Sequence, residues 1–507
     1  MDESAPPRSW LDRIDEIARQ HPDVPVLTMA DATGEILSWR DLSWRSAGVA
    51  WAFAACGVRQ GTTVSIQLPN SLAFVLAALA AWRLGATVAP IRWDLPAPER
   101  AQLVALARPA LVITEAGGGD GEMAAAQVAA APPVDPAGFW PMPIAVPAWM
   151  TASGGSTGAP KLIAPKVTTA MGEASGMGFT GGRSNFADNR DHRHPVHLVC
   201  TPLYHMHGFS LLFRTLTEDF RVVIMDKFEP EPFLDLVERE KVNFLALVPT
   251  IAVRLLKSPT IRNRDLSSIE NVILGAGATP DWAIRELIAL TSPETIKLGY
   301  GMSESLAASF LRGDEWLEHP GSVGKVINAE TLVVDEDGRP LPVGEVGELY
   351  FRPTNGGEAF RYVGDSVPRT LPGGWASVGD LGRLDAEGYL YIADRRTDMV
   401  KTGGSNVFVS EVEAALLQHA DVADVAVIGL PDPEWTRRVH AVVQLRPGAD
   451  PAGMDAVLRG HCKALLAAYK APRSFEFVAE LGRTDAGKIN RQALTRAREP
   501  QSEREQA

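Results

Sequence analysis

Residues 151–161 read TASGGSTGAPK and bring four hydroxyl side chains and three glycines together within eight residues. Glycines allow a loop to direct several backbone N–H groups into one concavity, and serine and threonine hydroxyls add further donors. Such a loop suits the oxygens of a phosphate, and Lys161 adds a positive charge. The pattern differs from G-x-x-x-x-G-K-[ST], because Ala159 and Pro160 separate Gly158 from the lysine. A flexible glycine- and serine-rich turn is the alternative, and the number of donors favours a phosphate-binding loop over it.

The charge balance argues against a nucleic-acid partner. The 507 residues include 49 basic and 62 acidic side chains, which gives a formal net charge of −13. A protein that binds a polyphosphate backbone needs a basic surface, so no nucleic acid is expected, although a local basic pocket for a phosphate ligand remains compatible with this balance. The composition, 46% hydrophobic and 22% charged, is typical of a globular protein with several cores.

The cysteines and the apolar segments point to a cytoplasmic protein. Cys56, Cys200 and Cys462 lie far apart, which disfavours a disulfide framework and a cysteine-built zinc site and fits a reducing compartment. The N-terminal residues MDESAPPRSW lack the pattern of a secretory signal. The most apolar segment, residues 72–82, runs into Arg83 and is too short to span a bilayer, so we expect a buried helix there.

Strands and helices predicted from the hydrophobic periodicity must form the framework that positions the loop. Strand-like and helix-like segments alternate over residues 60–115 and again from 195 to 300, which predicts two doubly wound α/β lobes with mainly parallel sheets. Residues 116–148 are rich in Ala, Gly and Pro and are expected to form a solvent-facing connection. Short β-type runs over 320–392 predict a small antiparallel barrel or sheet, and residues 396–495 predict a small α+β domain.

The loop resembles the phosphate loop of the adenylate-forming superfamily, which includes acyl- and aryl-CoA synthetases, beetle luciferases and the adenylation domains of peptide synthetases. Further segments resemble the family in the same order, over about residues 35–495. They are PLYHMHGF (202–209), GYGMSES (299–305), GELYFRP (347–353), SVGDLG (377–382), DRRTDMVKTGG (394–404) and GRTDAGKINR (482–491).

The resemblance implies an acyl-CoA synthetase that uses ATP, Mg²⁺ and coenzyme A. A carboxylate attacks the α-phosphate of ATP and releases pyrophosphate, and a thiol then displaces AMP from the acyl-adenylate. Because two anions approach each other, such a site needs cations and oriented donors more than it needs a base. The family's fold is a large N-terminal domain of two doubly wound lobes and a small β-barrel, followed by a mobile α+β domain. Transferred to this chain, the bounds are 1–394, a hinge at 395–398 and 399–507.

The resemblance also assigns residues to the nucleotide. Tyr300 would stack on adenine, Ser303 would reach a phosphate, Glu304 would hold magnesium, and Asp380 would accept both ribose hydroxyls with Arg395 beside it. The GAGA segment, residues 275–278, would let the backbone approach the base and the acid. The implied binding set is Ser153, Gly154, Gly155, Ser156, Thr157, Gly158, Lys161, Gly275, Ala276, Gly277, Tyr300, Gly301, Met302, Ser303, Asp380, Arg395, Lys401, Gly403 and Gly404.

Two further residues take catalytic roles by resemblance. Lys488 would bridge the carboxylate and the α-phosphate, and His205 would act as the gate between the acid pocket and the thiol tunnel. Gly403 and Gly404 would line that tunnel after the C-terminal domain rotates. The chain departs from the family's usual residues at Gly482 (proline), at the hinge residue Thr397 (aspartate or lysine) and at Leu298 (glutamine).

The sequence does not determine which carboxylic acid is the substrate. The pocket is expected to involve Met206, His207, Phe209 and Ser210, and Gly299 leaves room for an aryl, fatty or polycyclic acyl group. No acidic residue is present in 205–209 to hold a substrate ammonium, so an amino acid is disfavoured. The alternatives are an enzyme that only thiolates a supplied acyl-AMP, a ligase that loads a carrier protein, and a non-catalytic nucleotide-binding switch protein. The last is disfavoured by the retained charged residues Lys161, Glu304, Asp380 and Lys488.

Overall fold

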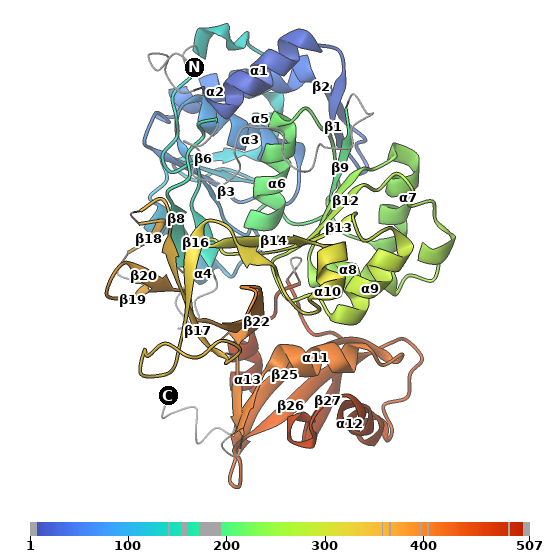
Figure 1. The fold of residues 1–507 in the computed structure, drawn as a ribbon. Coiled ribbons are helices and arrows are strands. Elements are labelled where there is room, and N and C mark those ends of the chain that lie inside the picture. The colour runs from blue at the N-terminus through green and yellow to red at the C-terminus, as the bar shows by residue number, and fades with distance from the viewer. Residues whose placement is uncertain are drawn as a thin grey trace.

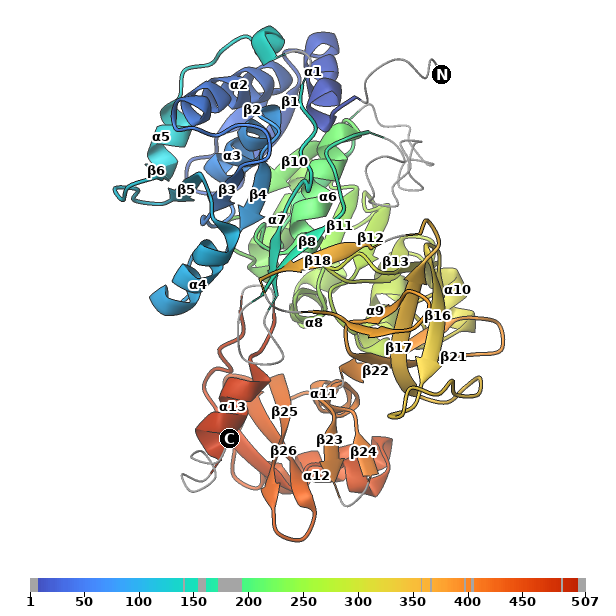
Figure 2. The same cartoon turned by 90° about the vertical axis from the view of Figure 1, so that its left-hand side faces the viewer.

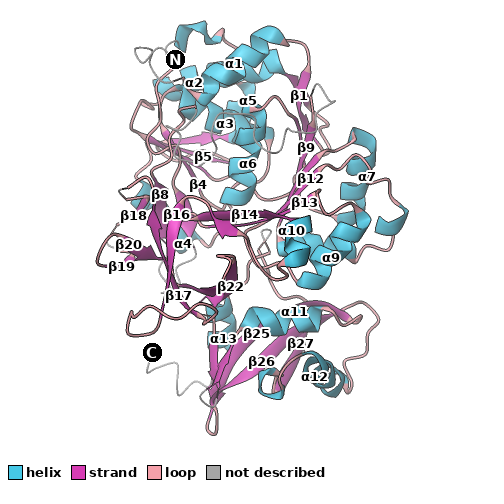
Figure 3. Ribbon diagram, viewed as in Figure 1, coloured by secondary structure: helices cyan, strands magenta, loops and turns pink. Residues whose placement is uncertain are grey.

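The computed structural model describes residues 8–139, 142–153, 161–171, 194–356, 358–364, 367–395, 398–402, 405–484 and 487–499 (Figure 1). Helices and strands alternate through the larger, N-terminal part, while the helices and strands nearest the C-terminus gather at the lower end of two perpendicular views (Figures 2 and 3). The predicted α/β class, with a large N-terminal and a small C-terminal part, is confirmed. The predicted domain bounds and the hinge remain predictions.

The largest sheet has nine strands in the order β15-β14-β13-β12-β11-β9-β10-β1-β2. Its six central strands are parallel, and β2, β14 and β15 pair antiparallel at the edges. The strands are β1 (Pro25–Met29), β2 (Ile36–Ser38), β9 (Val196–Val199), β10 (Arg221–Ile224), β11 (Phe244–Leu247), β12 (Asn271–Leu274), β13 (Ile296–Gly301), β14 (Ala308–Arg312) and β15 (Lys325–Val326). The helices along this part of the chain are α6 (Met206–Thr217), α7 (Pro230–Glu240), α8 (Pro249–Leu256), α9 (Asp281–Leu290) and α10 (Gly313–Glu318).

The second sheet is parallel, in the order β4-β3-β5-β6. Its strands are β3 (Thr63–Ile66), β4 (Thr87–Pro90), β5 (Leu111–Thr114) and β6 (Glu122–Ala124), and the helices of this region are α1 (Trp10–Gln20), α2 (Trp39–Ala55), α3 (Leu72–Arg83), α4 (Ala97–Ala107) and α5 (Ala125–Ala130). The expectation of a plain connection over 116–148 was wrong in part, because β6 extends this sheet and Val128 of α5 is buried. The Ala-rich composition hid both elements.

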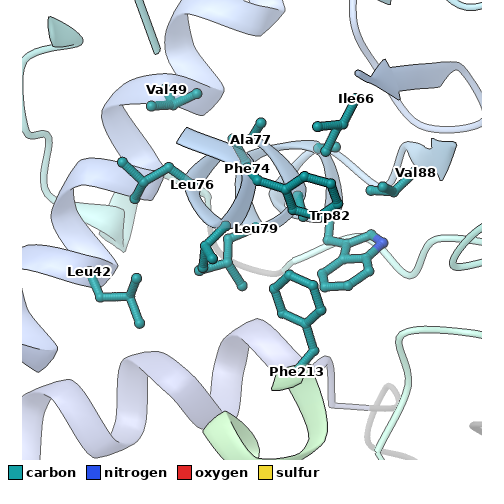
Figure 4. Packing of buried hydrophobic residues seen from close by; sticks show 14 of the residues in the cluster. Leu42, Val49, Ile66, Phe74, Leu76, Ala77, Leu79, Trp82, Val88 and Phe213 are labelled. Atoms are coloured by element: carbon teal, nitrogen blue, oxygen red, sulfur yellow. The ribbon is translucent and has the colours of Figure 1, made fainter. Parts of the chain in front are cut away.

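Helix α3 is the buried helix that its apolar run predicted. Every residue from Leu72 to Arg83 is buried, and Ser71 caps the helix by accepting a hydrogen bond from the Phe74 N–H. Its side chains pack between α2, the second sheet and Phe213 of α6 (Figure 4). None of the helices in the described ranges is long and apolar enough to cross a membrane.

The buried end of α3 carries a charge that is fully paired. The Arg83 guanidinium donates to both carboxylate oxygens of Asp15, at 2.9 and 2.5 Å, and also to the Ser46 hydroxyl. A buried charge is tolerated only when its partners replace water, so this ion pair ties α1 and α2 to α3.

Two smaller sheets follow. A three-stranded antiparallel sheet contains β7 (Thr151–Ser153), β8 (Lys161–Pro165) and β18 (Phe360–Val363). A six-stranded sheet contains β16 (Ala329–Val334), β17 (Gly347–Pro353), β19 (Arg369–Leu371), β20 (Trp375–Ser377), β21 (Asp380–Leu384) and β22 (Leu390–Arg395). Within the described residues five of these strands follow the order β19-β20-β17-β21-β22, and β16 pairs with β17 beside this path. The two end strands β19 and β22 do not pair with each other, so the expected small barrel is an open antiparallel sheet.

The C-terminal part has its own hydrophobic core, whose buried members lie between Val400 and Ala471. Its elements are β23 (Val400–Thr402), β24 (Ser405–Val407), α11 (Val409–Leu417), β25 (Val422–Asp432), β26 (Thr436–Leu445), α12 (Met454–Leu465), β27 (Ser474–Val478) and α13 (Arg491–Arg498). Strands β25, β26 and β27 form one mixed sheet. A domain with a separate core is able to move as a unit.

Candidate active site

A cleft of about 3350 Å³ lies between the large N-terminal part and the C-terminal part, and residues of both line it. The carboxyl ends of β11, β12 and β13 open into this cleft, at the edge where open α/β sheets bind their ligands. Most of the described residues that the sequence singled out line it. They are Lys161, His205, Met206, His207, Ser210, Gly275, Ala276, Gly277, Tyr300, Gly301, Met302, Ser303, Glu304, Asp380, Arg395 and Lys488.

Tyr300 and Asp380 form the first polar cluster. The Tyr300 hydroxyl, at the end of β13, donates to Asp380 Oδ2 at 2.6 Å, and Arg395 Nε lies 3.4 Å from Asp380 Oδ1. Asp380 opens β21 and is paired in register with Arg395 at the end of β22, which explains how residues 15 positions apart meet. Burial, followed by the Asp380 charge, raises the pKa of Tyr300, so the phenol stays protonated and remains a donor.

Glu304 lies in a second cluster. The Tyr362 hydroxyl, from β18, donates to Glu304 Oε1 at 3.1 Å, and Lys161 Nζ lies 5.3 Å from the centre of the Tyr362 ring. Tyr362 pairs with Ile163 across β8 and β18, so the lysine that follows the glycine loop and the tyrosine share one small sheet. The sequence alone does not reveal Tyr362, because nothing in its local pattern marks it and Glu304 is 58 positions away.

The surroundings of Glu304 fit a hard divalent cation. Its carboxylate lines the cleft but is only 9% exposed, and burial raises its pKa against the opposing effects of its own backbone, Tyr362 and Arg395. A magnesium ion prefers oxygen ligands and stabilises a carboxylate that burial has disfavoured. Glu304 is therefore the described residue that would hold Mg²⁺, and the ion would neutralise phosphate charge there.

Lys488 and His205 face the same cleft from opposite domains. The Lys488 side chain keeps contact with the water of the cleft, yet protein surrounds it, and this burial lowers its pKa; Arg395 lowers it further and Glu304 acts in the opposite direction. His205, the residue before α6, has a pKa lowered to about 3, by burial first and then by Lys488 and Arg92. All three residues line the cleft, so the lysine, the histidine and the carboxylate belong to one site.

The loop that carries Lys488 is held against the N-terminal part. Gly487 has φ +70°, and a Cβ added to it would lie 1.8 Å from Thr250 Oγ1 of α8. Lys257 Nζ, just after α8, donates to the Val422 carbonyl at 2.6 Å. Within the loop, Arg483 donates to the Gly487 carbonyl at 2.8 Å. Gly482 has φ +63°, which proline cannot adopt, so the departure from the family's usual residue goes with a different local backbone.

The GAGA segment after β12 leaves no room for a side chain at its first residue. A Cβ on Gly275 would lie 2.8 Å from His207 Cε1, and one on Gly277 would lie 3.3 Å from the Pro249 ring. Ala276 has φ +63°, an uncommon conformation for a residue with a Cβ. The segment therefore presents its backbone to the cleft.

Some of the predicted site residues lie outside the described ranges, and one described residue lies away from the cleft. Gly154, Gly155, Ser156, Thr157, Gly158, Thr397, Gly403 and Gly404 are outside the described residues. The backbone of Ser153 ends β7 and pairs with Lys161, so the two ends of the glycine loop adjoin. Lys401 does not line the cleft, and its ammonium pairs with Glu336 at 2.6 Å.

The expected acid pocket needs one correction. Phe209 is fully buried in an aromatic cluster with Phe74, Trp82, Trp149 and Phe213, and it does not line the cleft. Helical geometry explains this, since Phe209 and Phe213 share the face of α6 that packs on the core.

The chain matches a known family along most of its length. Residues 14–357 match the family model described as AMP-binding enzyme, and residues 411–488 match the AMP-binding enzyme C-terminal domain. The medium/long-chain-fatty-acid–CoA ligase FadD8 of Mycobacterium tuberculosis is 33% identical over 353 residues, which cover 68% of this chain and 60% of that protein. The 2-succinylbenzoate–CoA ligase of Geobacillus kaustophilus is 29% identical over 465 residues, 89% of this chain and 91% of that protein.

Solved structures agree with these matches. The o-succinylbenzoate CoA synthetase of Bacillus subtilis, in complex with the acyl-adenylate intermediate OSB-AMP, superposes with a TM-score of 0.76 at 26% identity, covering 96% of this chain and 98% of that one. The same enzyme in complex with ATP and a magnesium ion gives a TM-score of 0.76 at 25% identity, covering 96% and 99%.

Proposed function

The chain belongs to the AMP-binding enzyme family, and from that premise we propose that it is an AMP-forming acid–thiol ligase. It activates a carboxylic acid as acyl-AMP and transfers the acyl group to coenzyme A. Relatives named as CoA ligases for fatty acids, 2-succinylbenzoate and sulfoacetate support coenzyme A as the acceptor. The complexes of a relative with acyl-AMP and with ATP and magnesium support the adenylate route.

One observation carries this proposal. Lys488, from the C-terminal part, lines the same cleft as Glu304 and Arg395, from the N-terminal part, and the charges of these two residues act on the pKa of its ammonium. A lysine near a C-terminus is ordinarily a solvated surface charge, whereas Lys488 lies in a cleft with the buried carboxylate of Glu304. An ammonium in this place is useful where two anions must be brought together.

The first half-reaction uses these groups to offset negative charge. A carboxylate oxygen of the acid forms a bond to the α-phosphorus of ATP, the bond from that phosphorus to the bridging oxygen breaks, and pyrophosphate leaves with the electron pair. Lys488 neutralises the carboxylate and the α-phosphate as they approach, while Lys161 and the adjoining glycine loop hold the outgoing phosphates. Asp380 accepts from the ribose hydroxyls, with Tyr300 and Arg395 fixing its orientation. Glu304 would hold Mg²⁺, which would supply charge neutralisation on the phosphates.

The second half-reaction needs a different arrangement. The thiol sulfur of coenzyme A, after losing its proton, attacks the acyl carbon, and the carbon–oxygen bond to AMP breaks. We propose domains at 1–394 and 399–507 with a hinge at 395–398. Rotation about this hinge withdraws Lys488 and brings the segment with Lys401, Gly403 and Gly404 to the cleft. In the arrangement described here Lys401 is paired with Glu336 at the surface.

The test is pyrophosphate release from ATP with a panel of aryl, fatty and polycyclic acids, with and without coenzyme A, together with detection of the thioester. Pyrophosphate and thioester formed together support the proposal. Adenylate that accumulates while no thioester forms redirects the function to loading of a carrier protein. Thioester formed from synthetic acyl-AMP, with no pyrophosphate from any acid, identifies an enzyme that only thiolates. If neither pyrophosphate nor thioester forms from either starting point, a catalytic role is contradicted.

A further inference from the structure

A lysine that does not line the cleft joins the two parts of the molecule. Lys257 follows directly after α8, and its Nζ donates to the Val422 carbonyl at 2.6 Å, from the N-terminal part to the C-terminal part. Burial lowers the pKa of Lys257 to about 8; Arg446 lowers it further, and Asp424 acts in the opposite direction. The ammonium is still mostly protonated at pH 7, so it remains a charged donor to this carbonyl.

Helix α8 meets the C-terminal part at two places. Thr250, in its first turn, packs against Gly487. Lys257 lies at the other end of the helix and contacts Val422. The seven positions from Thr250 to Lys257 correspond to about 10 Å along a helix axis. A single contact leaves a domain free to pivot, whereas two separated contacts also fix how the domain is turned.

A path of polar contacts runs from Val422 to the loop that carries Lys488. Strand β25 has a register shift between Val422 and Asp424, and a β-bulge of this kind interrupts the ladder and bends the strand. Asp424 accepts a hydrogen bond from Arg483 Nε at 2.6 Å, and the two side chains are only 24% and 17% exposed. The same guanidinium donates to the Gly487 carbonyl at 2.8 Å. Ion pairs shielded from water are screened less than exposed ones, so this path couples the start of β25 to the loop.

We propose that Lys257 is a positioning residue for adenylate formation, because its bond to Val422 sets the placement from which Lys488 enters the cleft. Asp424 and Arg483 transmit this placement to the loop. The inference rests on the proposed ligase function and adds a residue to its first half-reaction. Lys257 has no part in the second half-reaction, since the proposed rotation carries Val422 away from α8 before the thiol attacks.

The size of the effect follows from the bond that is lost. A hydrogen bond from a charged donor that forms in only one arrangement raises the population of that arrangement by about 10-fold or more. Loss of the Lys257 ammonium is therefore expected to lower kcat for pyrophosphate release by about 10-fold. The KM for ATP is expected to stay within about twofold, because Lys257 does not line the cleft.

The experiment measures both half-reactions separately, with the acid of the panel that the wild-type protein uses best. Lys257→Met keeps the length of the side chain without its charge, and its pyrophosphate release is expected to fall by about 10-fold. Its thioester formation from synthetic acyl-AMP and coenzyme A is expected to stay within about twofold of the wild type. Lys257→Arg keeps a charged donor and is expected to recover most of the lost rate.

Two further variants separate positioning from a general effect on the fold. Lys241→Met removes a lysine that pairs with Asp265 at 3.0 Å within the N-terminal part and does not line the cleft, so both half-reactions are expected to be unchanged. Asp424→Asn weakens the next contact on the path and is expected to slow pyrophosphate release as Lys257→Met does. The double variant is expected to be little slower than the slower single variant, because both substitutions interrupt the same path.

The outcomes separate this inference from the function on which it rests. Unchanged pyrophosphate release in Lys257→Met, or an equal loss in both half-reactions, overturns the positioning role and leaves the ligase function standing. Losses in Lys257→Met and Asp424→Asn that multiply in the double variant also overturn it, because the two residues would then act independently. Absence of pyrophosphate with every acid in the wild-type protein overturns the ligase function and this inference with it.

Discussion

Gly487→Ala tests whether the arrangement described here is the one that forms the adenylate. Gly487 precedes Lys488 and has φ +70°, and a Cβ at this position would lie 1.8 Å from Thr250 Oγ1 and 2.7 Å from Thr250 Cβ. A normal contact needs about 3.5 Å, so the loop must retreat from α8 by more than about 1 Å. The left-handed conformation adds about 1 kcal/mol for alanine, whatever the neighbours do.

The magnitude follows from how closely Lys488 must be placed. A displacement of about 1 Å in a catalytic group costs about 100-fold in rate, so pyrophosphate release by Gly487→Ala is expected to fall by about that factor. Thioester formation from synthetic acyl-AMP and coenzyme A is expected to stay within about twofold, because the proposed rotation removes Gly487 from Thr250 before that step.

The control isolates the clash from the backbone strain. Gly448 also has a positive φ, +90°, but a Cβ there would meet nothing within 4 Å, so Gly448→Ala carries the strain alone and is expected to leave both half-reactions unchanged. Equal losses in both half-reactions of Gly487→Ala would refute the reasoning. So would an unchanged rate of pyrophosphate release, since it would mean that Lys488 works from a different arrangement.

Three further predictions concern stability and the metal site. Burial raises the pKa of Asp394 to about 6, so the charged form of Asp394 destabilises the fold as pH rises through 6. Asp394→Asn is therefore expected to raise the free energy of unfolding, measured by urea denaturation, by about 2–3 kcal/mol at pH 8. Below pH 4 the same substitution is expected to change it little. Asp15→Ala leaves Arg83 buried without its carboxylate and is expected to lower the free energy of unfolding by about 3–5 kcal/mol in the same assay, and a loss under 1 kcal/mol would contradict the fully buried pairing. Tyr362→Phe removes the hydrogen bond to Glu304 and is expected to change the Mg²⁺ concentration needed for half-maximal pyrophosphate release several-fold, while an unchanged magnesium dependence would disconnect the tyrosine from the metal site.

Periodicity and the order of motifs predicted the α/β class of the fold, and most of the described candidate site residues line one cleft. The apolar run at 72–82 is buried on all sides as α3, because a helix without a polar face has to be covered. The segments around Tyr300 and Asp380 are far apart in sequence, and they meet because β13 ends at the cleft and β21 begins there. The local sequence of each segment does not reveal that the other segment is its partner.

The predictions failed where tertiary packing decides. Phe209 lies within a motif that lines the cleft, yet its position on α6 turns it into the aromatic core. Residues 122–130 are mostly small, and only pairing with β5 makes a strand of part of them. Tyr362 reaches Glu304 because two small strands pair, and no residue spacing reveals such a contact in advance.

The most direct test of the central claim is a comparison of Lys488→Ala with the wild-type protein in the two half-reactions measured separately, with the best acid of the panel. We expect pyrophosphate release to fall by about 1000-fold or more, while ATP binding and thioester formation from supplied acyl-AMP stay near the wild-type level. Pyrophosphate release at an unchanged rate would contradict the claim that the ammonium at position 488 completes the adenylate-forming site.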